Sequence, residues 1–279
     1  NQFSPTDDDA RMDALLWQSR VLFEMDEALR NREIYIALQP QLNIRSGRIS
    51  SAEVLVRWIH PEMGVISPAE FVQMAERGKR IDQLTQYVIQ SSFQFLRDAQ
   101  KIDPGFNIAV NISPSLIGSA EFEFMLHAAL RVYGVKASSI MLEITENEQL
   151  LNNSGAQDAM GRLRDAGFGI SIDDYGAGLS TLTYLLKVPA NEVKLDRTLI
   201  STLRYNERSQ LLIQSTISVA QSLGMHVVAE GVEDPDTLAI LRTLECNLAQ
   251  GYFIGQPVGA EEILSILESS SSVQAVAQA

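Results

Sequence analysis

The sequence predicts an α/β protein whose strands close into an eight-stranded barrel. The chain has 279 residues, which suits one barrel of the usual size. Short runs rich in β-branched residues alternate with longer amphipathic runs, and this alternation is typical of parallel βα units. The eight strand candidates match a closed barrel. An open doubly wound sheet is the main alternative, although no glycine-rich phosphate loop follows the first strand.

Each predicted strand is a short run of apolar or β-branched residues. The strands are expected at residues 36–44, 51–58, 106–112, 140–145, 169–173, 192–195, 226–229 and 247–253. Apolar residues at helical spacing fill most of the gaps between them, as connections between parallel strands require. The helices are expected at residues 68–75, 81–100, 121–133, 156–166, 179–186, 209–223, 235–244 and 260–267.

The two ends of the chain are predicted to lie outside the barrel domain, which we expect over residues 30–268. Residues 1–29 form a lead-in helix from an upstream domain, because apolar residues recur there at helical spacing after an acidic start. Residues 269–279 have no periodic core face and are expected to form a flexible tail. The first residue is Asn1 rather than Met, so we expect a fragment of a longer protein.

Composition and charge narrow the possible functions. The chain carries 22 Lys and Arg against 35 Asp and Glu, a net charge of −13, so binding to the phosphates of duplex DNA is not expected. The single cysteine, Cys246, excludes an internal disulfide and a cysteine zinc site, and it suits a reducing compartment. No apolar run is long enough to insert into a membrane. We therefore expect a cytoplasmic protein, or the cytoplasmic part of a membrane-anchored one.

Polar residues recur near the carboxyl ends of the predicted strands. In a parallel barrel these ends open onto one face, so the side chains are expected to meet there. One glutamate in such a place is usually a solvated loop residue, but five carboxylates with amides and a lysine are harder to explain in that way. Oxygen ligands of this kind suit Mg²⁺ or Mn²⁺, and the three histidines are not paired at metal-ligand spacing; His60 and His127 are expected at the surface. The set comprises Glu53, Asn111, Glu143, Asp173, Asp174, Lys194, Glu230 and Gln250.

At these positions the sequence resembles the EAL-domain family, phosphodiesterases that cleave the bacterial second messenger cyclic di-GMP. The family's signature tripeptide appears as Glu53-Val54-Leu55, with Val54 in place of the usual alanine. The resemblance runs from about Arg30 to Leu267, nearly the whole chain. The other matching motifs are Gln39-Pro40, Asn111-Ile112-Ser113, Glu143-Ile144-Thr145-Glu146, DDYGAG from Asp173 to Gly178, Lys194-Leu195-Asp196, EGVE from Glu230 to Glu233, and Gln250-Gly251-Tyr252.

The resemblance implies a TIM-like barrel with one antiparallel strand and a site for two divalent cations, Mg²⁺ or Mn²⁺, with Ca²⁺ inhibitory. It also implies a homodimer and upstream signalling domains. The implied ligands are Glu53, Asn111, Glu143 and Asp173 for the first cation, and Asp174 and Glu230 for the second. The implied catalytic residues are Glu53, Lys194, Glu230, Gln250 and Glu146, of which Lys194 positions or activates the attacking water and Glu146 anchors the DDYGAG loop. The implied nucleotide contacts are Gln39, Leu55, Arg57, Asn111, Arg197, Glu233 and Tyr252.

Two departures from the family pattern concern this site. The usual DDFGTG loop is DDYGAG here, so Tyr175 adds a hydroxyl and Ala177 removes one. Both aspartates and both glycines are kept, so metal binding is expected to survive while loop movement and dimer coupling can differ. Val54 is a small increase in volume beside Glu53, and its side chain is expected to point away from the site because strand residues alternate.

Three functions are therefore weighed. The first is hydrolysis of cyclic di-GMP to linear pGpG, which the full set of family ligands supports. The second is a binding module that senses cyclic di-GMP without turnover, which the altered loop supports. The third, an unrelated metal-dependent barrel enzyme acting on a small acid, leaves the EVLVRW and EGVE motifs unexplained.

Overall fold

The structure is a computed structural model that describes residues 7–145, 153–177 and 182–277. The chain divides into two compact units. The first comprises Asn1–Ile36 and Val56–Val88, and the second comprises Ala37–Leu55 and Ile89–Ala279. The barrel domain expected over 30–268 therefore contributes residues to both units.

Eight strands form the closed barrel, as the sequence predicts. They follow the order β1-β9-β8-β7-β6-β5-β4-β2, and β1 also pairs with β2. All neighbouring pairs from β2 through β4 to β9 are parallel, whereas β1 is antiparallel to β9. The strands are β1 Ile34–Asn43, β2 Arg48–His60, β4 Asn107–Asn111, β5 Ile140–Thr145, β6 Gly169–Tyr175, β7 Glu192–Leu195, β8 His226–Ala229 and β9 Leu248–Ala249.

The reversed direction of β1 has a local cause. Only the turn of residues 44–47 separates β1 from β2, and a connection this short can join antiparallel strands but not parallel ones. Gly47 closes the turn at φ +70°, and its N–H donates to the carbonyl of Asn43 at 2.8 Å. The one antiparallel strand implied by the family resemblance is therefore β1.

The strands place apolar and charged side chains on opposite faces. On β5, Leu142 and Ile144 are buried on one face, so Glu143 points to the other. On β7, Val193 and Leu195 alternate in the same way with Lys194. Because parallel strands are covered on both faces, the barrel interior can bury these charged groups instead of exposing them.

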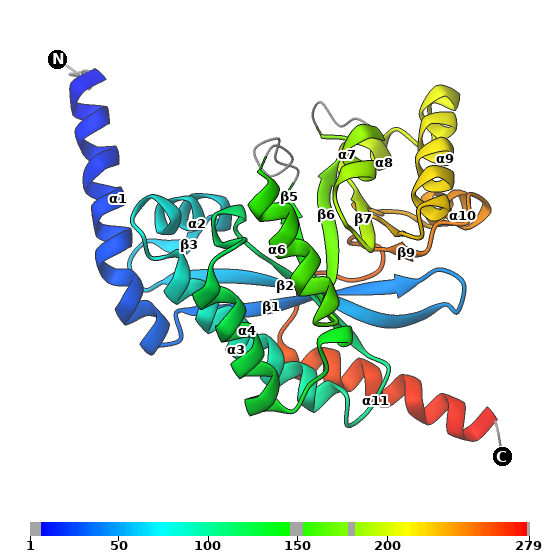
Figure 1. The fold of residues 1–279 in the computed structure, drawn as a ribbon, viewed down its shortest axis with the longest axis horizontal. Coiled ribbons are helices and arrows are strands. Elements are labelled where there is room, and N and C mark those ends of the chain that lie inside the picture. Colours follow the sequence, from blue (N-terminus) through cyan, green and yellow to red (C-terminus); the bar gives the residue numbers. More distant parts are fainter. Residues whose placement is uncertain (1–6, 146–152, 178–181, 278–279) are drawn as a thin grey trace. The chain divides into compact units, whose positions relative to one another are not determined.

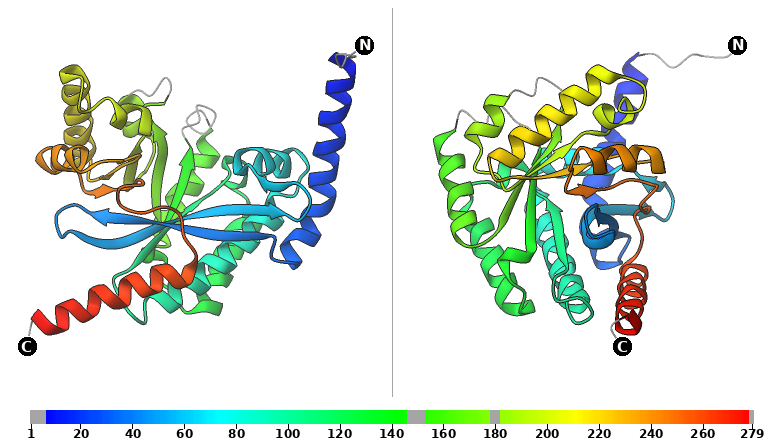
Figure 2. Two further views of the ribbon diagram at one scale, coloured as in Figure 1. Left: turned by 180° about the vertical axis from the view of Figure 1, so that it is seen from behind. Right: turned by 90° about the vertical axis from the view of Figure 1, so that its right-hand side faces the viewer.

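Helices surround the strands of the second unit, as the right-hand view of Figure 2 shows. In Figure 1, α11 lies at the end of the barrel where β5 and β6 begin. None of the described helices combines the length and the apolar character needed to cross a bilayer. The helices are α3 Ile81–Ala99, which begins in the first unit, α4 Ala120–Tyr133, α6 Ser154–Asp165, α7 Leu182–Lys187, α8 Arg197–Ser201, α9 Glu207–Ser222, α10 Pro235–Thr243 and α11 Ala260–Ala277, with the 3₁₀ turns η1 Pro114–Leu116 and η2 Ala137–Ser139.

Side-chain caps fix several helix starts, and two helices differ from the sequence prediction. Asn153, Asn206 and Asp234 each accept a backbone N–H at the start of α6, α9 and α10. The helix α8 was not predicted because it is only five residues long. The helix α11 continues to Ala277 through the segment expected to be a tail, which contains no Gly or Pro to end it.

The first unit contains α1 Asp7–Arg30, α2 Pro68–Arg77 and a short strand, β3 Gly64–Ile66, that pairs antiparallel with the end of β2. The three-residue β3 was not predicted because it is too short to show a pattern. Trp58 is fully buried and packs edge-on against Phe71 of α2, with ring centroids 5.6 Å apart.

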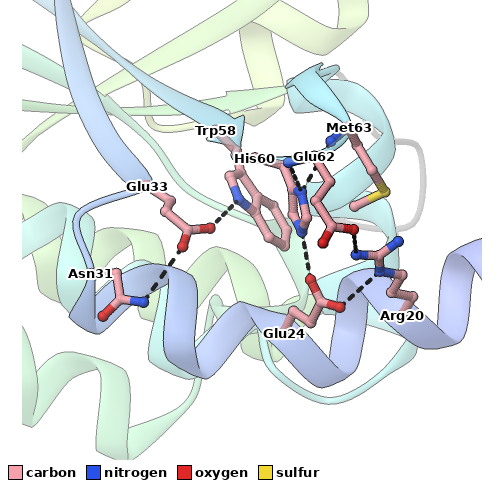
Figure 3. Close-up of polar contacts among 8 residues, drawn as sticks. All are labelled: Arg20, Glu24, Asn31, Glu33, Trp58, His60, Glu62 and Met63. Atoms are coloured by element: carbon pink, nitrogen blue, oxygen red, sulfur yellow. Dashed lines mark hydrogen bonds and ion pairs between the residues drawn. The ribbon is translucent and has the colours of Figure 1, made fainter.

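Polar contacts join α1 to the end of β2 within this unit (Figure 3). The prediction that His60 lies at the surface is wrong, because its ring is 3% exposed. Its Nδ1 accepts the backbone N–H groups of Glu62 and Met63, so Nε2 carries the proton and donates to a carboxylate oxygen of Glu24 at 2.5 Å. Arg20 binds both Glu24 and Glu62.

Replacing Glu24 with glutamine is expected to loosen α1. The change removes the charge that pairs with Arg20 and weakens the acceptor for the buried His60 ring, a loss of about 1 kcal/mol. Amide hydrogen exchange of residues 16–30 should then accelerate about fivefold, while exchange of the barrel strands stays the same. Glu27→Gln, an exposed change on the same helix, is the control. Equal exchange in both variants would contradict the anchoring role.

Candidate active site

A buried lysine lies at the centre of a cluster of carboxylates in the second unit. Lys194 is 1% exposed. Its Nζ lies 2.8 Å from an oxygen of Glu230, 3.0 Å from Asp173, 3.1 Å from Glu143 and 3.4 Å from Glu53. These residues belong to β2, β5, β6 and β7 and to the position after β8. The structure thus brings together side chains from four strands and from the residue that follows a fifth.

Glu143 is the least well satisfied member of the cluster. Neither of its carboxylate oxygens receives a hydrogen bond from the described residues, and the same holds for Oδ1 of Asp173. Oε1 of Glu143 and Oδ1 of Asp173 lie 3.1 Å and 3.0 Å from the Lys194 ammonium. Burial and the nearby charge of Glu53 hold the pKa of Glu143 well above its usual range. Lys194 alone therefore does not compensate the charge that the ionised cluster would carry.

Glu53 is held in its charged form by its neighbours. Asn111 Nδ2 donates to Oε1 at 2.8 Å, and Gln250 Nε2 donates to Oε2 at 2.5 Å. Burial opposes ionisation, but the charge of Lys194 and the hydrogen bond from Gln250 outweigh it and lower the pKa of Glu53. Burial raises the pKa of Glu230 to about 7 despite the same ammonium.

The cluster fits a divalent cation. Asp173, Asp174 and Glu230 each offer one carboxylate oxygen, and these oxygens lie within 4.8 Å of one another. The buried oxygens of Glu143 and Asp173 that lack hydrogen-bond donors provide further acceptor capacity. Carboxylates are the ligands that Mg²⁺ and Mn²⁺ prefer. Asp174 reaches its place from a left-handed backbone, with φ +56°, which aspartate tolerates better than most residues.

A pocket of about 210 Å³ opens beside the cluster. Its wall contains Glu53 and Glu230 together with residues that the sequence predicts as nucleotide contacts. In it, Arg197 Nη2 lies 2.6 Å from Glu233 Oε1, and Tyr252 is 61% exposed. The lining residues are Gln39, Glu53, Arg197, Glu230, Gly231, Glu233, Gln250, Gly251 and Tyr252.

The comparison with protein families decides what this arrangement represents. The model of the EAL domain matches residues 24–257. The chain belongs to the EAL domain family. The resemblance inferred from the motifs is thereby confirmed.

Two curated EAL-domain relatives come from Pseudomonas aeruginosa. Cyclic di-GMP phosphodiesterase NbdA is 36% identical over 236 residues, which are 84% of this chain and 30% of NbdA. Cyclic di-GMP phosphodiesterase RocR is 33% identical over 242 residues, which are 87% of this chain and 62% of RocR. The chain therefore spans only part of the length of these relatives.

A solved structure, that of the PaMucR phosphodiesterase in complex with c-di-GMP, is also similar to this EAL domain. It superposes with a TM-score of 0.81 at 31% identity and covers 88% of this chain and 99% of that one. The barrel fold is therefore that of solved EAL domains.

Two predicted site residues in the described part of this EAL domain, Leu55 and Arg57, lie in neither the cluster nor the pocket lining. Leu55 is half-buried on β2. Arg57 belongs to the first unit, where its Nη1 donates to the carbonyl of Val56 at 2.9 Å. Glu146 lies outside the described residues, as does Gly178 of the DDYGAG loop.

The sequence analysis missed several buried polar residues of the EAL barrel, among them Gln41, Ser51 and Glu192. Gln41 is 2% exposed, Ser51 is 7% exposed and Glu192 is 5% exposed. Each lies two residues from a predicted site residue on the same strand: Gln39, Glu53 and Lys194 respectively. Because strand side chains alternate, this spacing was a signal that could have placed them on the interior face.

Glu192 is expected to make the stability of the metal-free protein depend on pH. Burial raises its pKa to about 7 from an ordinary value of 4.5. The folded protein then binds this proton more tightly than the unfolded chain, so the stabilisation is complete below pH 4.5 and is lost as the pH rises through 7. The loss amounts to about 3 kcal/mol.

Glu192→Gln should remove this contribution and flatten the pH profile. The measurement is urea unfolding with EDTA at several pH values from 5 to 8. Glu261→Gln, an exposed change on α11, is the control and should keep the wild-type slope. A Glu192→Gln profile as steep as that of the wild type would show that Glu192 does not titrate in this range.

Proposed function

We propose that this EAL domain hydrolyses one phosphodiester of cyclic di-GMP and releases linear pGpG, with two divalent cations, Mg²⁺ or Mn²⁺, as cofactors. The observation that carries the proposal is the buried cluster of carboxylates around Lys194, which has oxygens without donors and lies beside a pocket. Support also comes from the relatives NbdA and RocR, both named as cyclic di-GMP phosphodiesterases, and from the PaMucR complex with c-di-GMP.

The cations would be held by the acidic cluster. When bound, they would supply a water of lowered pKa and compensate the charge that develops on the phosphate. This compensation explains how a chain with a net charge of −13 could accept an anionic dinucleotide. The proposed ligands are Glu53, Asn111, Glu143 and Asp173 for one cation, and Asp174 and Glu230 for the other.

The protein's own groups would hold the reacting atoms in place. The ammonium of Lys194 lies 2.8–3.4 Å from oxygens of the carboxylates and would position the attacking water. Gln250 fixes Oε2 of Glu53 with its amide, so this carboxylate keeps one orientation. Glu230, whose pKa burial raises to about 7 in the metal-free protein, would be kept ionised by a bound cation and act as its ligand. Glu146 is proposed as the anchor of the DDYGAG loop.

The pocket side chains would bind the nucleotide. Arg197 and Glu233 form an exposed pair at the pocket and offer a donor and an acceptor. Tyr252 presents an exposed ring on which a base could stack. Arg57 would contribute a bidentate phosphate contact. The remaining proposed contacts are Gln39, Leu55 and Asn111.

The test is incubation of the purified chain with cyclic di-GMP and Mg²⁺ or Mn²⁺, followed by chromatographic separation of the nucleotides. We expect pGpG with either cation and inhibition by Ca²⁺. Glu53→Ala should abolish hydrolysis and keep the wild-type circular dichroism spectrum, whereas Glu261→Ala should be fully active. Hydrolysis by Glu53→Ala at the wild-type rate would overturn the proposal. Tight binding without any product would favour the sensor function instead.

The assembly and location of the protein belong to the same proposal. We expect a homodimer, which light scattering can check. We also expect upstream signalling domains, since the chain spans 30% of NbdA, and a cytoplasmic location, which agrees with the buried free thiol of Cys246.

A further inference from the structure

A chain of buried hydrogen bonds links the acidic cluster to the opposite end of the barrel. Gln250 Nε2 donates to Glu53 Oε2 at 2.5 Å, and Gln250 Oε1 accepts from Gln41 Nε2 at 2.8 Å. Gln41 Oε1 in turn accepts from the Ser51 hydroxyl at 2.7 Å. Gln250 also donates to Gln39 Oε1 at 3.0 Å. All of these residues belong to the second unit.

The direction of this chain is determined by its members. An ionised Glu53 can only accept hydrogen bonds, so Gln250 must turn its NH₂ group toward it. The carbonyl oxygen of Gln250 then points to Gln41 and needs a donor, which the NH₂ group of Gln41 provides. The carbonyl oxygen of Gln41 needs a donor as well, and the Ser51 hydroxyl supplies it.

The far end of the chain lies at the barrel floor, by which we mean the end where the parallel strands begin. A cavity of about 1020 Å³ opens there, and both Gln41 and Ser51 line it. Its wall also contains the first residues of several strands, among them Asn107, Ile140 and Gly169. The chain of hydrogen bonds therefore crosses the barrel interior from the floor cavity to the pocket beside the acidic cluster.

We propose that Gln41 and Ser51 are positioning residues that act on Glu53 through Gln250. They lock the Gln250 amide in the orientation that presents its NH₂ group to Glu53, and so fix the carboxylate for cation binding. This inference rests on the proposed function of Glu53 as a cation ligand. Partners that orient a ligand from behind typically change metal affinity or activity 10- to 100-fold when they are removed.

The effect of breaking this chain of hydrogen bonds depends on which residue is replaced. Gln41→Met keeps the length of the side chain but leaves Gln250 Oε1 without its donor. Gln41→Glu places an acceptor against that oxygen, so the Gln250 amide must turn over and present its oxygen to Glu53. Ser51→Ala removes only the last donor, and Ser51→Thr restores the hydroxyl at a position that lines the cavity.

The first experiment measures binding of Mn²⁺ alone to each variant by calorimetry, which does not depend on turnover. We expect the affinity to fall about tenfold in Gln41→Met, further in Gln41→Glu, and by less in Ser51→Ala, with recovery in Ser51→Thr. Gln210→Met is the matched control, because it removes a partly buried hydrogen bond from the Gln210 side-chain amide to the carbonyl of Leu203, which is not part of this hydrogen-bond chain. Wild-type affinity in both Gln41 variants would overturn the proposal.

The second experiment separates positioning from a general structural role. The side-chain NH₂ resonances of Gln250 should shift in NMR spectra of metal-free Gln41→Met and Ser51→Ala, and stay unchanged in Gln210→Met. With cyclic di-GMP, kcat should fall about tenfold in Gln41→Met while KM stays close to the wild-type value. A lowered Tm with unchanged Mn²⁺ affinity and unchanged Gln250 resonances would show that Gln41 and Ser51 only stabilise the barrel.

The two proposals can fail separately. If the wild-type protein binds cyclic di-GMP without hydrolysing it, the proposed hydrolysis fails, but the Mn²⁺ affinities and the Gln250 resonances still test the positioning role. If the wild type is active and the Gln41 and Ser51 variants match it in both kcat and Mn²⁺ affinity, only the positioning role fails.

Discussion

Replacing Lys194 with methionine is expected to destabilise the metal-free protein by about 3–5 kcal/mol. Lys194 is almost fully buried, and its ammonium is the cation that faces four carboxylates at 2.8–3.4 Å. Although burial disfavours a charged lysine, the charges of Glu143 and Glu53 hold its pKa well above the ordinary value. Methionine fills a similar volume but leaves these carboxylates with no opposing charge.

The loss of stability in Lys194→Met should depend on pH and on added cations. Without the ammonium, the carboxylates bind protons more tightly in the folded protein, so the variant loses stability as the pH rises, and the difference from wild type should be larger at pH 8 than at pH 5. Mn²⁺ should restore more stability to the variant than to the wild type, because a cation binds only the folded cluster.

Urea unfolding with EDTA and with Mn²⁺ tests this prediction. Lys187→Met, an exposed change at the end of α7, is the control and should unfold like the wild type. A Lys194→Met protein as stable as this control at pH 8 would show that the cluster does not depend on the ammonium. Hydrolysis should fall at least about a hundredfold in Lys194→Met even with Mn²⁺ present.

Much of the cluster could be predicted from the sequence because strand position alone determines it. Glu143, Asp173 and Lys194 each stand in a short apolar strand, and a parallel barrel brings such positions to one face. Gln41 and Ser51 were missed because a single glutamine or serine in a strand is common, and only the pairing of β1 with β2 and β9 makes these residues neighbours.

Other features depended on contacts that no local pattern records. The burial of His60 results from backbone N–H groups of the following turn and from Glu24 on α1, which is far away in the sequence. The helix α8 forms because Asp196 caps it, but five residues are too few to show a helical period. The division into two units follows from long-range packing, so the sequence pattern of alternating strands and helices could not reveal it.

Replacing Glu143 with glutamine is expected to stabilise the metal-free protein and to weaken cation binding at the same time. Glu143 is 1% exposed, and no described residue donates a hydrogen bond to either carboxylate oxygen. Since burial and Glu53 raise its pKa, the ionised form is costly in the folded state and metal-free stability falls as the pH rises above 4.5. Glutamine keeps the volume, removes the charge and adds an NH₂ group.

The unfolding free energy with EDTA at pH 8 should therefore rise by about 1–3 kcal/mol, with a flatter pH profile than that of the wild type. The gain in Tm on adding Mn²⁺ should shrink, and hydrolysis should fall at least about a hundredfold. Glu262→Gln, an exposed change on α11, should alter none of these values. Stability should rise while cation binding falls only if the carboxylates destabilise the metal-free protein and bind a cation. If the cluster instead stabilised the metal-free protein, removing one carboxylate would lower both the stability and the cation affinity.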